Sequence, residues 1–195
     1  MKTREHPFIT YIETFSQRDD KGALAALRRG LGQLPGLVPD MYRYVVPRLP
    51  QDAYPGSWTE RCHYLIAALY AMHPVATDDG NLGKHFAAHL DYERPDGNDA
   101  IERRFIALLT AHPDDLHIYL RQGISFLRSK DTPVNWHQLM WDVLSLGNPD
   151  GATRVQKQWA NGFWRRGTPT QEAAEAGSEE SADDEENEAT DESDD

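Results

Sequence analysis

The chain has a single cysteine and no long apolar run. Cys62 alone cannot form an internal disulfide or a multi-cysteine zinc site, and so few thiols are typical of a protein in a reducing cytosol. No segment approaches the roughly 18 consecutive apolar residues that a membrane-spanning helix needs. The N-terminus lacks the apolar region of a secretory signal. We therefore expect a cytoplasmic protein with no membrane segment.

The last 25 residues of the chain, 171–195, contain no Lys or Arg. Residues 171–195 also lack aromatic residues, Leu, Ile and Val, yet they hold 13 of the 32 Asp and Glu residues. The rest of the chain has 19 acids against all 20 Lys and Arg, so the net charge of −12 describes the tail and not the body. A segment this poor in apolar side chains cannot bury enough surface to offset the entropy of ordering. We predict a disordered acidic tail over residues 169–195.

Alternating runs of Val, Ile and Thr, which would indicate β-strands, are also missing. Apolar residues instead recur at helical spacing along the body, separated by Pro and Gly. Polar residues typical of helix starts precede these stretches: Asp20, Ser57 with Glu60, Asp99 with Glu102, and Asn135.

The fold class predicted from this pattern is all-α, with about nine helices in two packed helical bundles. Residues 94–98 (RPDGN) form the best internal hinge. We therefore expect an N-terminal bundle over residues 1–92 and a C-terminal bundle over residues 93–168.

Residue groups that would indicate catalysis are weak. His85 and His89 are four residues apart on one predicted helix, a spacing that suits a metal, but neither a second ligand cluster nor an intervening glutamate accompanies them. Residues 80–84 (GNLGK) lack the Walker spacing and a preceding strand. Cys62 lies on an apolar helix stripe, where burial is the usual role. We expect a protein that is not an enzyme and that needs no metal or cofactor.

Arginine is the residue type whose arrangement stands out. Arg28 and Arg29 are adjacent, as are Arg103 and Arg104, while Arg121 and Arg128 are seven apart and share a helix face. Residues 24–39 and 116–129 contain no acid, so local salt bridges along one helix do not explain these side chains. Each pair can be an ordinary solvated helix face. Unpaired guanidinium groups also suit phosphate oxygens, which they bind in a bidentate manner.

Taken in order, the segments of the body resemble the CasB family, the small subunit of the type I-E CRISPR surveillance complex, Cascade. The resemblance covers roughly residues 8–165. The segments that carry it are residues 22–29 (GALAALRR), 42–47 (YRYVVP), 65–69 (LIAAL), 81–84 (NLGK), 102–109 (ERRFIALL), 119–121 (YLR), 133–139 (PVNWHQL) and 159–163 (WANGF).

The resemblance implies an all-helical, non-catalytic subunit that binds nucleic acid through backbone contacts. Its expected partners are the crRNA, the target and non-target DNA strands, the Cas7-type backbone, the Cas8-type large subunit and a second copy of itself. The subunit would hold the displaced non-target strand along a basic surface and thereby stabilise the R-loop. Arg28, Arg29, Arg103, Arg104 and Arg121 match basic positions of the family. Lys84 matches less closely because its loop varies, and Arg128 is added from helical phase alone.

Two further questions stay open at the level of sequence. The arginines of a helical interaction module can instead meet acidic proteins, which is the alternative to nucleic-acid binding. The acidic tail, which departs from the family pattern, can add solubility or can occupy the arginine surface until assembly. Tyr42, Tyr44, Trp58 and Trp136 are candidates for base stacking, although aromatic residues at helical spacing more often lie in the core.

Overall fold

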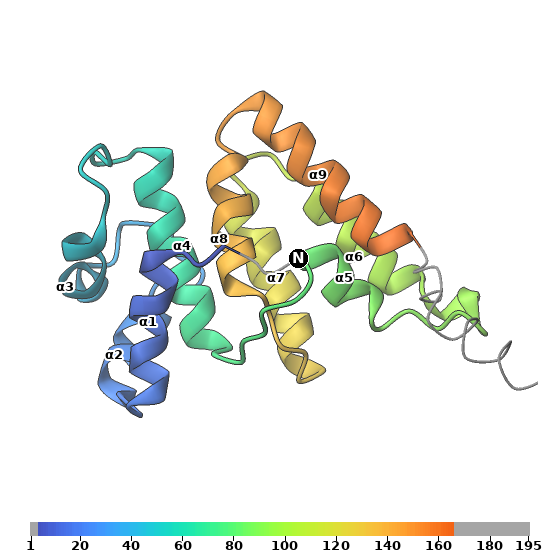
Figure 1. The fold of residues 1–195 in the computed structure, drawn as a ribbon, viewed down its shortest axis with the longest axis horizontal. Coiled ribbons are helices and arrows are strands. Elements are labelled where there is room, and N and C mark those ends of the chain that lie inside the picture. Colours follow the sequence, from blue (N-terminus) through green and yellow to red (C-terminus); the bar gives the residue numbers. More distant parts are fainter. Residues whose placement is uncertain (1–3, 166–195) are drawn as a thin grey trace, which may run out of the picture. The chain divides into compact units, whose positions relative to one another are not determined.

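The structure, a computed structural model, describes residues 4–165, and within them all regular secondary structure is helical (Figure 1). One isolated parallel bridge joins Ala76 to Val134. This confirms the predicted all-α class and the approximate number of helices, while the predicted tail lies outside the described residues. The α-helices are α1 (Pro7–Gln17), α2 (Lys21–Arg28), α3 (Tyr42–Val45), α4 (Trp58–Met72), α5 (Leu82–Ala87), α6 (Asp99–Leu109), α7 (Leu116–Ser129), α8 (Trp136–Ser145) and α9 (Pro149–Trp164), with short 3-10 turns η1 (Pro39–Met41), η2 (Val46–Arg48) and η3 (Pro95–Gly97).

Side-chain caps begin several of these helices. The side-chain oxygens of Asp20, Ser57 and Asn135 each accept a hydrogen bond from a backbone N–H in the first turn of the following helix. One expected start is wrong. Asp99 lies inside α6, and the residue before it, Asn98, uses its side chain to bond the backbone of Asp91 instead. The side chain of Asn98 therefore stabilises the loop before α6 and not the first turn of that helix.

Helix α4 lies at the centre of the packing. The N-terminal helices α1, α2 and α3 pack against it, and α7 and α8 also contact it (Figure 1). A helix that is buried on most of its sides must be apolar around most of its circumference. The buried residues of α4 accordingly run almost without a break: Cys62, His63, Tyr64, Ile66, Ala67, Ala68, Leu69, Tyr70 and Ala71.

The C-terminal helices pack around a very close crossing of α5 and α9. A Cβ atom on Gly83 of α5 would lie 1.9 Å from the carbonyl oxygen of Trp159 on α9. Only glycine lets the two backbones approach this closely. The crossing joins residues on both sides of the boundary expected at residue 92, and the described residues up to Trp164 belong to one compact unit. The division into bundles over 1–92 and 93–168 stays a prediction.

None of the helices in residues 4–165 is long and apolar enough to cross a bilayer.

Replacing Gly83 with alanine tests this crossing. The new methyl group would meet a backbone carbonyl, which cannot rotate away, so α5 and α9 must separate. We expect Gly83→Ala to lower the free energy of unfolding by roughly 1–3 kcal/mol, measured by urea denaturation. Gly97→Ala is the matched control, because a Cβ atom there has no heavy atom within 4 Å. Equal stability of the two variants would contradict the close crossing.

Candidate nucleic-acid interface

One surface groove follows the exposed side of α7. It has a volume of about 720 Å³ and takes one wall residue from α6 and one from the loop after α2. Within the described residues its walls contain two arginines and a histidine but no Asp or Glu. The lining residues are Gly32, Arg104, His117, Ile118, Arg121, Gln122, Ser125, Phe126 and Ser129. We call this feature the α7 groove.

Arg104 enters the groove from α6. Its guanidinium carbon lies 4.8 Å from the centre of the Phe126 ring on α7, in a cation–π contact. The side chain is half-buried, so the aromatic ring restricts its orientation. Because the ring is neutral overall, the positive charge of Arg104 is held in place without being cancelled.

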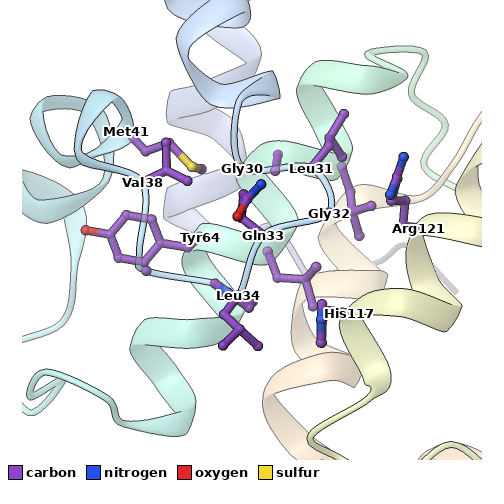
Figure 2. A pocket seen from close by; sticks show the side chains of 15 residues that line it. Gly30, Leu31, Gly32, Gln33, Leu34, Val38, Met41, Tyr64, His117 and Arg121 are labelled. Carbon is purple, nitrogen blue, oxygen red and sulfur yellow. The ribbon is translucent and has the colours of Figure 1, made fainter.

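Arg121 faces the loop that follows α2. Figure 2 shows Arg121 and His117 projecting from α7 toward this loop, with Gly32 beside Arg121. A Cβ atom on Gly32 would lie 2.8 Å from Nη1 of Arg121, and the φ angle of Gly32 is +78°, a conformation that favours glycine. The backbone conformation therefore favours glycine at this point, and a larger residue would also displace the end of the Arg121 side chain. The cavity beneath the loop holds only about 10 Å³, which is too small for an organic ligand.

Arg28 and Arg29 lie at the end of α2 and do not line the groove. The Nε atom of Arg28 donates a 2.6 Å hydrogen bond to the carbonyl of Ala71, at the end of α4. Arg29 forms an ion pair of 2.7 Å with Asp40, from the 3-10 turn η1. The search for acids along one helix missed this partner, because the loop returns Asp40 to α2 from eleven residues away. The expectation that Arg29 is free of carboxylates is wrong.

The other predicted basic residues are exposed and lie outside the groove. Nε of Arg103 donates to the carbonyl of Asp99 on its own helix, at 3.2 Å. Lys84 and Arg128 are exposed, and neither takes part in an ion pair among residues 4–165. The structure thus gathers Arg104 and Arg121 into one groove, and the remaining five basic residues do not line it.

Sequence reasoning missed the polar residues of the groove. Gln122, Ser125 and Ser129 join Arg121 on the exposed side of α7, at spacings of three and four residues. The helical period of these positions was visible in the sequence, and the absence of acids in residues 116–129 was the signal that marked this face. Gly32 and Arg104 reach the groove from other elements through tertiary packing, so no pattern in the sequence of α7 indicates that they line it.

The two histidines considered as metal ligands have other partners. Nε2 of His85 accepts a 3.1 Å hydrogen bond from the backbone N–H of Asn135, and Nε2 of His89 lies 2.5 Å from the hydroxyl of Thr132. Burial lowers the pKa of His85 to about 4, so its imidazole is neutral near pH 7 and remains an acceptor. In the described part of the chain no group of three or more His, Cys, Asp or Glu is placed to hold a metal.

Most of the aromatic residues considered for stacking serve the fold. Trp136 is fully buried, and the indole N–H of Trp58 donates to the carbonyls of Val143 and Leu144. Tyr42, which is partly exposed, donates its hydroxyl hydrogen to the carbonyl of Gly36.

Cys62 is buried, and burial raises the pKa of its thiol. This agrees with the structural role expected for the cysteine.

The described residues define a small all-α protein with a cationic, acid-free surface groove. A protein-family model for the CRISPR-associated protein Cse2 matches residues 23–164. The CRISPR-associated protein Cse2 of Thermus thermophilus is 33% identical over 169 residues, which cover 85% of this chain and 92% of that protein. The chain belongs to the Cse2 family, whose members are also called CasB.

Solved structures agree with this membership. The crystal structure of CasB from Thermus thermophilus matches with a TM-score of 0.68 and 27% identity, over 82% of this chain and 96% of that chain. A chain of a CRISPR RNA-guided surveillance complex matches with a TM-score of 0.64 and 26% identity, over 88% and 95% of the two chains. The family resemblance inferred from sequence is therefore confirmed, as is the expectation of a non-catalytic subunit.

The buried histidines predict how stability depends on pH. Burial lowers the pKa values of His6 and His85 to about 4, whereas both take up protons near pH 6.5 in the unfolded chain. Unfolding therefore binds protons between about pH 6.5 and 4, and the free energy of unfolding falls as the pH falls through this window. Each histidine contributes up to about 1.4 kcal/mol per pH unit.

Urea denaturation between pH 7.5 and 4.5 measures this dependence. His85→Gln, which retains a hydrogen-bond acceptor, is expected to be less sensitive to acid than the natural sequence. The control is Gln51→Asn, which changes an exposed side chain that binds no proton in this pH range and should leave the slope unchanged. A slope that is the same in all three proteins would show that His85 is not held neutral by burial.

Proposed function

We propose that the chain is the small, non-catalytic subunit of a type I-E CRISPR surveillance complex, Cascade, and that it binds nucleic-acid backbone in the α7 groove. Its membership of the Cse2 family and the likeness to a chain of a solved surveillance complex support the assembly. The proposed partners are the crRNA, the target and non-target DNA strands, the Cas7-type and Cas8-type subunits and a second copy of the chain.

The observation that carries the groove assignment is the combination of two arginines with an absence of acids among the described lining residues. Arg104 and Arg121 reach the groove from two helices, and no Asp or Glu lines it among the described residues. Guanidinium groups bind phosphate oxygens in bidentate fashion, and the hydroxyl of Ser125 and the side-chain amide of Gln122 add neutral donors, whereas the Ser129 hydroxyl donates to the carbonyl of Phe126. Such contacts position a strand without reading its sequence.

This chemistry suits the stabilisation of an R-loop. The exchange of a DNA duplex for an RNA–DNA duplex is nearly balanced in free energy, so backbone contacts to the displaced strand shift the equilibrium toward the open state. A cationic groove with no base-specific wall is sufficient for this purpose. Binding should weaken as salt rises, because each phosphate contact releases counterions.

The basic residues outside the groove extend the proposed surface to different degrees. Arg28 and Arg103 are bound to carbonyl oxygens and keep their full charge, and Lys84 and Arg128 are exposed without an ion pair in residues 4–165. Arg29 must exchange Asp40 for a phosphate, which offsets most of what it gains. We place Arg29 last among the seven proposed contacts.

A protein-binding role is the second candidate function, and exposed apolar side chains favour it. Leu34, Leu37, Val46 and Tyr54, all from the segment between α2 and α4, expose between 51% and 69% of their surface. Exposed apolar side chains are typical of protein interfaces where they form one contiguous patch. This segment is proposed to dock on other protein subunits, while the α7 groove binds nucleic acid.

Reversal of the two groove charges tests the proposal. We expect Arg104→Glu combined with Arg121→Glu to weaken the binding of a fluorescent single-stranded oligonucleotide at least tenfold at low salt, since each charge-assisted hydrogen bond contributes about 1.5–3 kcal/mol. The slope of log K against log salt should also fall by roughly 1.4, for two lost phosphate contacts. Fluorescence anisotropy of the full chain measures both quantities.

The control is Arg18→Glu combined with Arg94→Glu, which changes the net charge equally at exposed positions outside the groove. Binding by the control within about threefold of the natural chain, with a clear loss in the groove variant, supports the proposal. An equal loss of affinity in both variants would show that only the net charge matters and would reject the groove as the binding site. The same pair of variants can be assembled into Cascade and assayed for R-loop formation.

A further inference from the structure

Helix α9 has an exposed face that the proposed function does not use. After Asp150 the helix contains no acid up to its end at Trp164. Val155, Trp159 and Phe163 are buried, and they define the face that packs on the rest of the protein. Exposed residues on the opposite side follow spacings of three and four and therefore share one face: Arg154, Lys157, Asn161 and Trp164.

Trp164 is the feature that distinguishes this face from an ordinary solvated helix. It is 46% exposed, whereas each of the other four tryptophans in the described residues is buried or half-buried. Its ring meets Phe105 and Phe163 nearly edge-on, at centroid distances of 5.5 and 5.0 Å and interplanar angles of 72° and 84°. Two buried phenylalanines thus fix the orientation of a large aromatic ring that remains accessible.

Cations flank this ring on the same face. Lys157 lies two helical turns before Trp164, a distance of about 10 Å along the axis, and Arg154 lies one turn further back. Neither takes part in an ion pair within residues 4–165. Nη2 of Arg154 donates a 3.5 Å hydrogen bond to the hydroxyl of Ser145. Burial raises the pKa of the Asp142 carboxyl, and the charge of Arg154 offsets part of that rise, so Arg154 already has an acidic neighbour. The charge of Lys157 is therefore the more available of the two to an external anion.

A fifth residue, Lys84 of α5, begins close to the end of α9. A Cβ atom on Gly162 would lie 3.0 Å from the backbone nitrogen of Lys84, so Lys84 begins beside the last turn of α9. The side-chain amide of Asn81 donates to the carbonyl of Gln158 at 3.0 Å and fastens the start of α5 to the same helix. Lys84 is exposed at this junction.

We propose that this α9 face is a second single-stranded nucleic-acid contact, in which Trp164 stacks on a base and Lys157, Arg154 and Lys84 bind phosphates. An accessible aromatic ring beside a row of cations is the arrangement by which proteins hold single strands without sequence preference. The contact is separate from the α7 groove, since none of these residues lines that groove.

An acidic protein segment is the other occupant that such a face can accept. The exposed residues of α9 before Trp164 argue against it, because Lys157, Gln158 and Asn161 are polar, whereas the two phenylalanines that meet the ring are buried. Protein interfaces usually surround a tryptophan with further apolar side chains at their centre. A base needs only the ring and the neighbouring charges.

Two substitutions at the ring test the stacking. With the full-length chain and a fluorescent 20-nucleotide oligo-dT, Trp164→Leu should weaken binding at least about fivefold, whereas Trp164→Phe should retain most of the affinity. A loss of the same size in both variants would contradict stacking. Unchanged binding by Trp164→Leu would reject the contact. Thermal denaturation of each variant separates a loss of contact from a loss of fold.

A direct readout and a charge comparison complete the test. Irradiation of the complex with an oligonucleotide that carries 5-bromodeoxyuridine should crosslink the tryptic peptide of residues 158–165, and crosslinks confined to other peptides would overturn the assignment. Arg154→Glu with Lys157→Glu should lower the salt slope of oligo-dT binding. If these substitutions weaken the binding of poly-glutamate as strongly as that of oligo-dT, the face binds an acidic protein and the proposal is wrong.

The assignments of the α7 groove and of the α9 face can be rejected independently of each other. In the Arg104→Glu/Arg121→Glu background, Trp164→Leu should reduce the remaining affinity further. If that background already abolishes binding and Trp164→Leu alone has no effect, the α9 inference fails while the groove stands. If only the α9 variants lose affinity, the groove assignment fails and the α9 contact stands.

Discussion

The burial of α4 is the constraint on which the rest of the structure depends. A helix surrounded by α1, α2, α3, α7 and α8 fixes the distance between the N-terminal helices and α7. The loop after α2 passes over this helix, and Tyr64 points toward it (Figure 2). Leu65 and Ala68 line the same small cavity beneath the loop. The loop thereby brings Gly32 against Arg121, so that one wall of the cationic groove is set by the packing of an apolar helix.

The arginines share a second physical principle, which concerns how they are held. Arg28 and Arg103 are bound by carbonyl oxygens, and Arg104 by the face of a phenylalanine ring. These partners are neutral, so they restrict the side chains without neutralising them. Only Arg29, of the seven proposed residues, has a carboxylate partner within residues 4–165. A surface of this kind loses little entropy on binding a polyanion and retains its charge for that purpose.

The sequence predicted what depends on local chemistry. Helical period and capping residues placed most helices, and Asp20, Ser57 and Asn135 cap as expected. The acid-free stretch of residues 116–129 marked the face of α7 that lines the groove. The predictions that were wrong depend on contacts outside a single helix: Asp40 pairs with Arg29 across a loop, and the side chain of Asn98 bonds to the backbone of Asp91. The exposure of Trp164 was not predicted, because tertiary packing decides which of the five tryptophans stays accessible.

The buried cysteine has a practical consequence. The thiolate is the species that reacts with maleimides, and burial keeps the Cys62 thiol protonated and shielded from reagents. The natural chain already contains this one cysteine and no other. A fluorophore or spin label attached through a cysteine introduced on the surface would therefore modify a single site without prior removal of native thiols. Distances within an assembled complex become measurable on an otherwise unaltered protein.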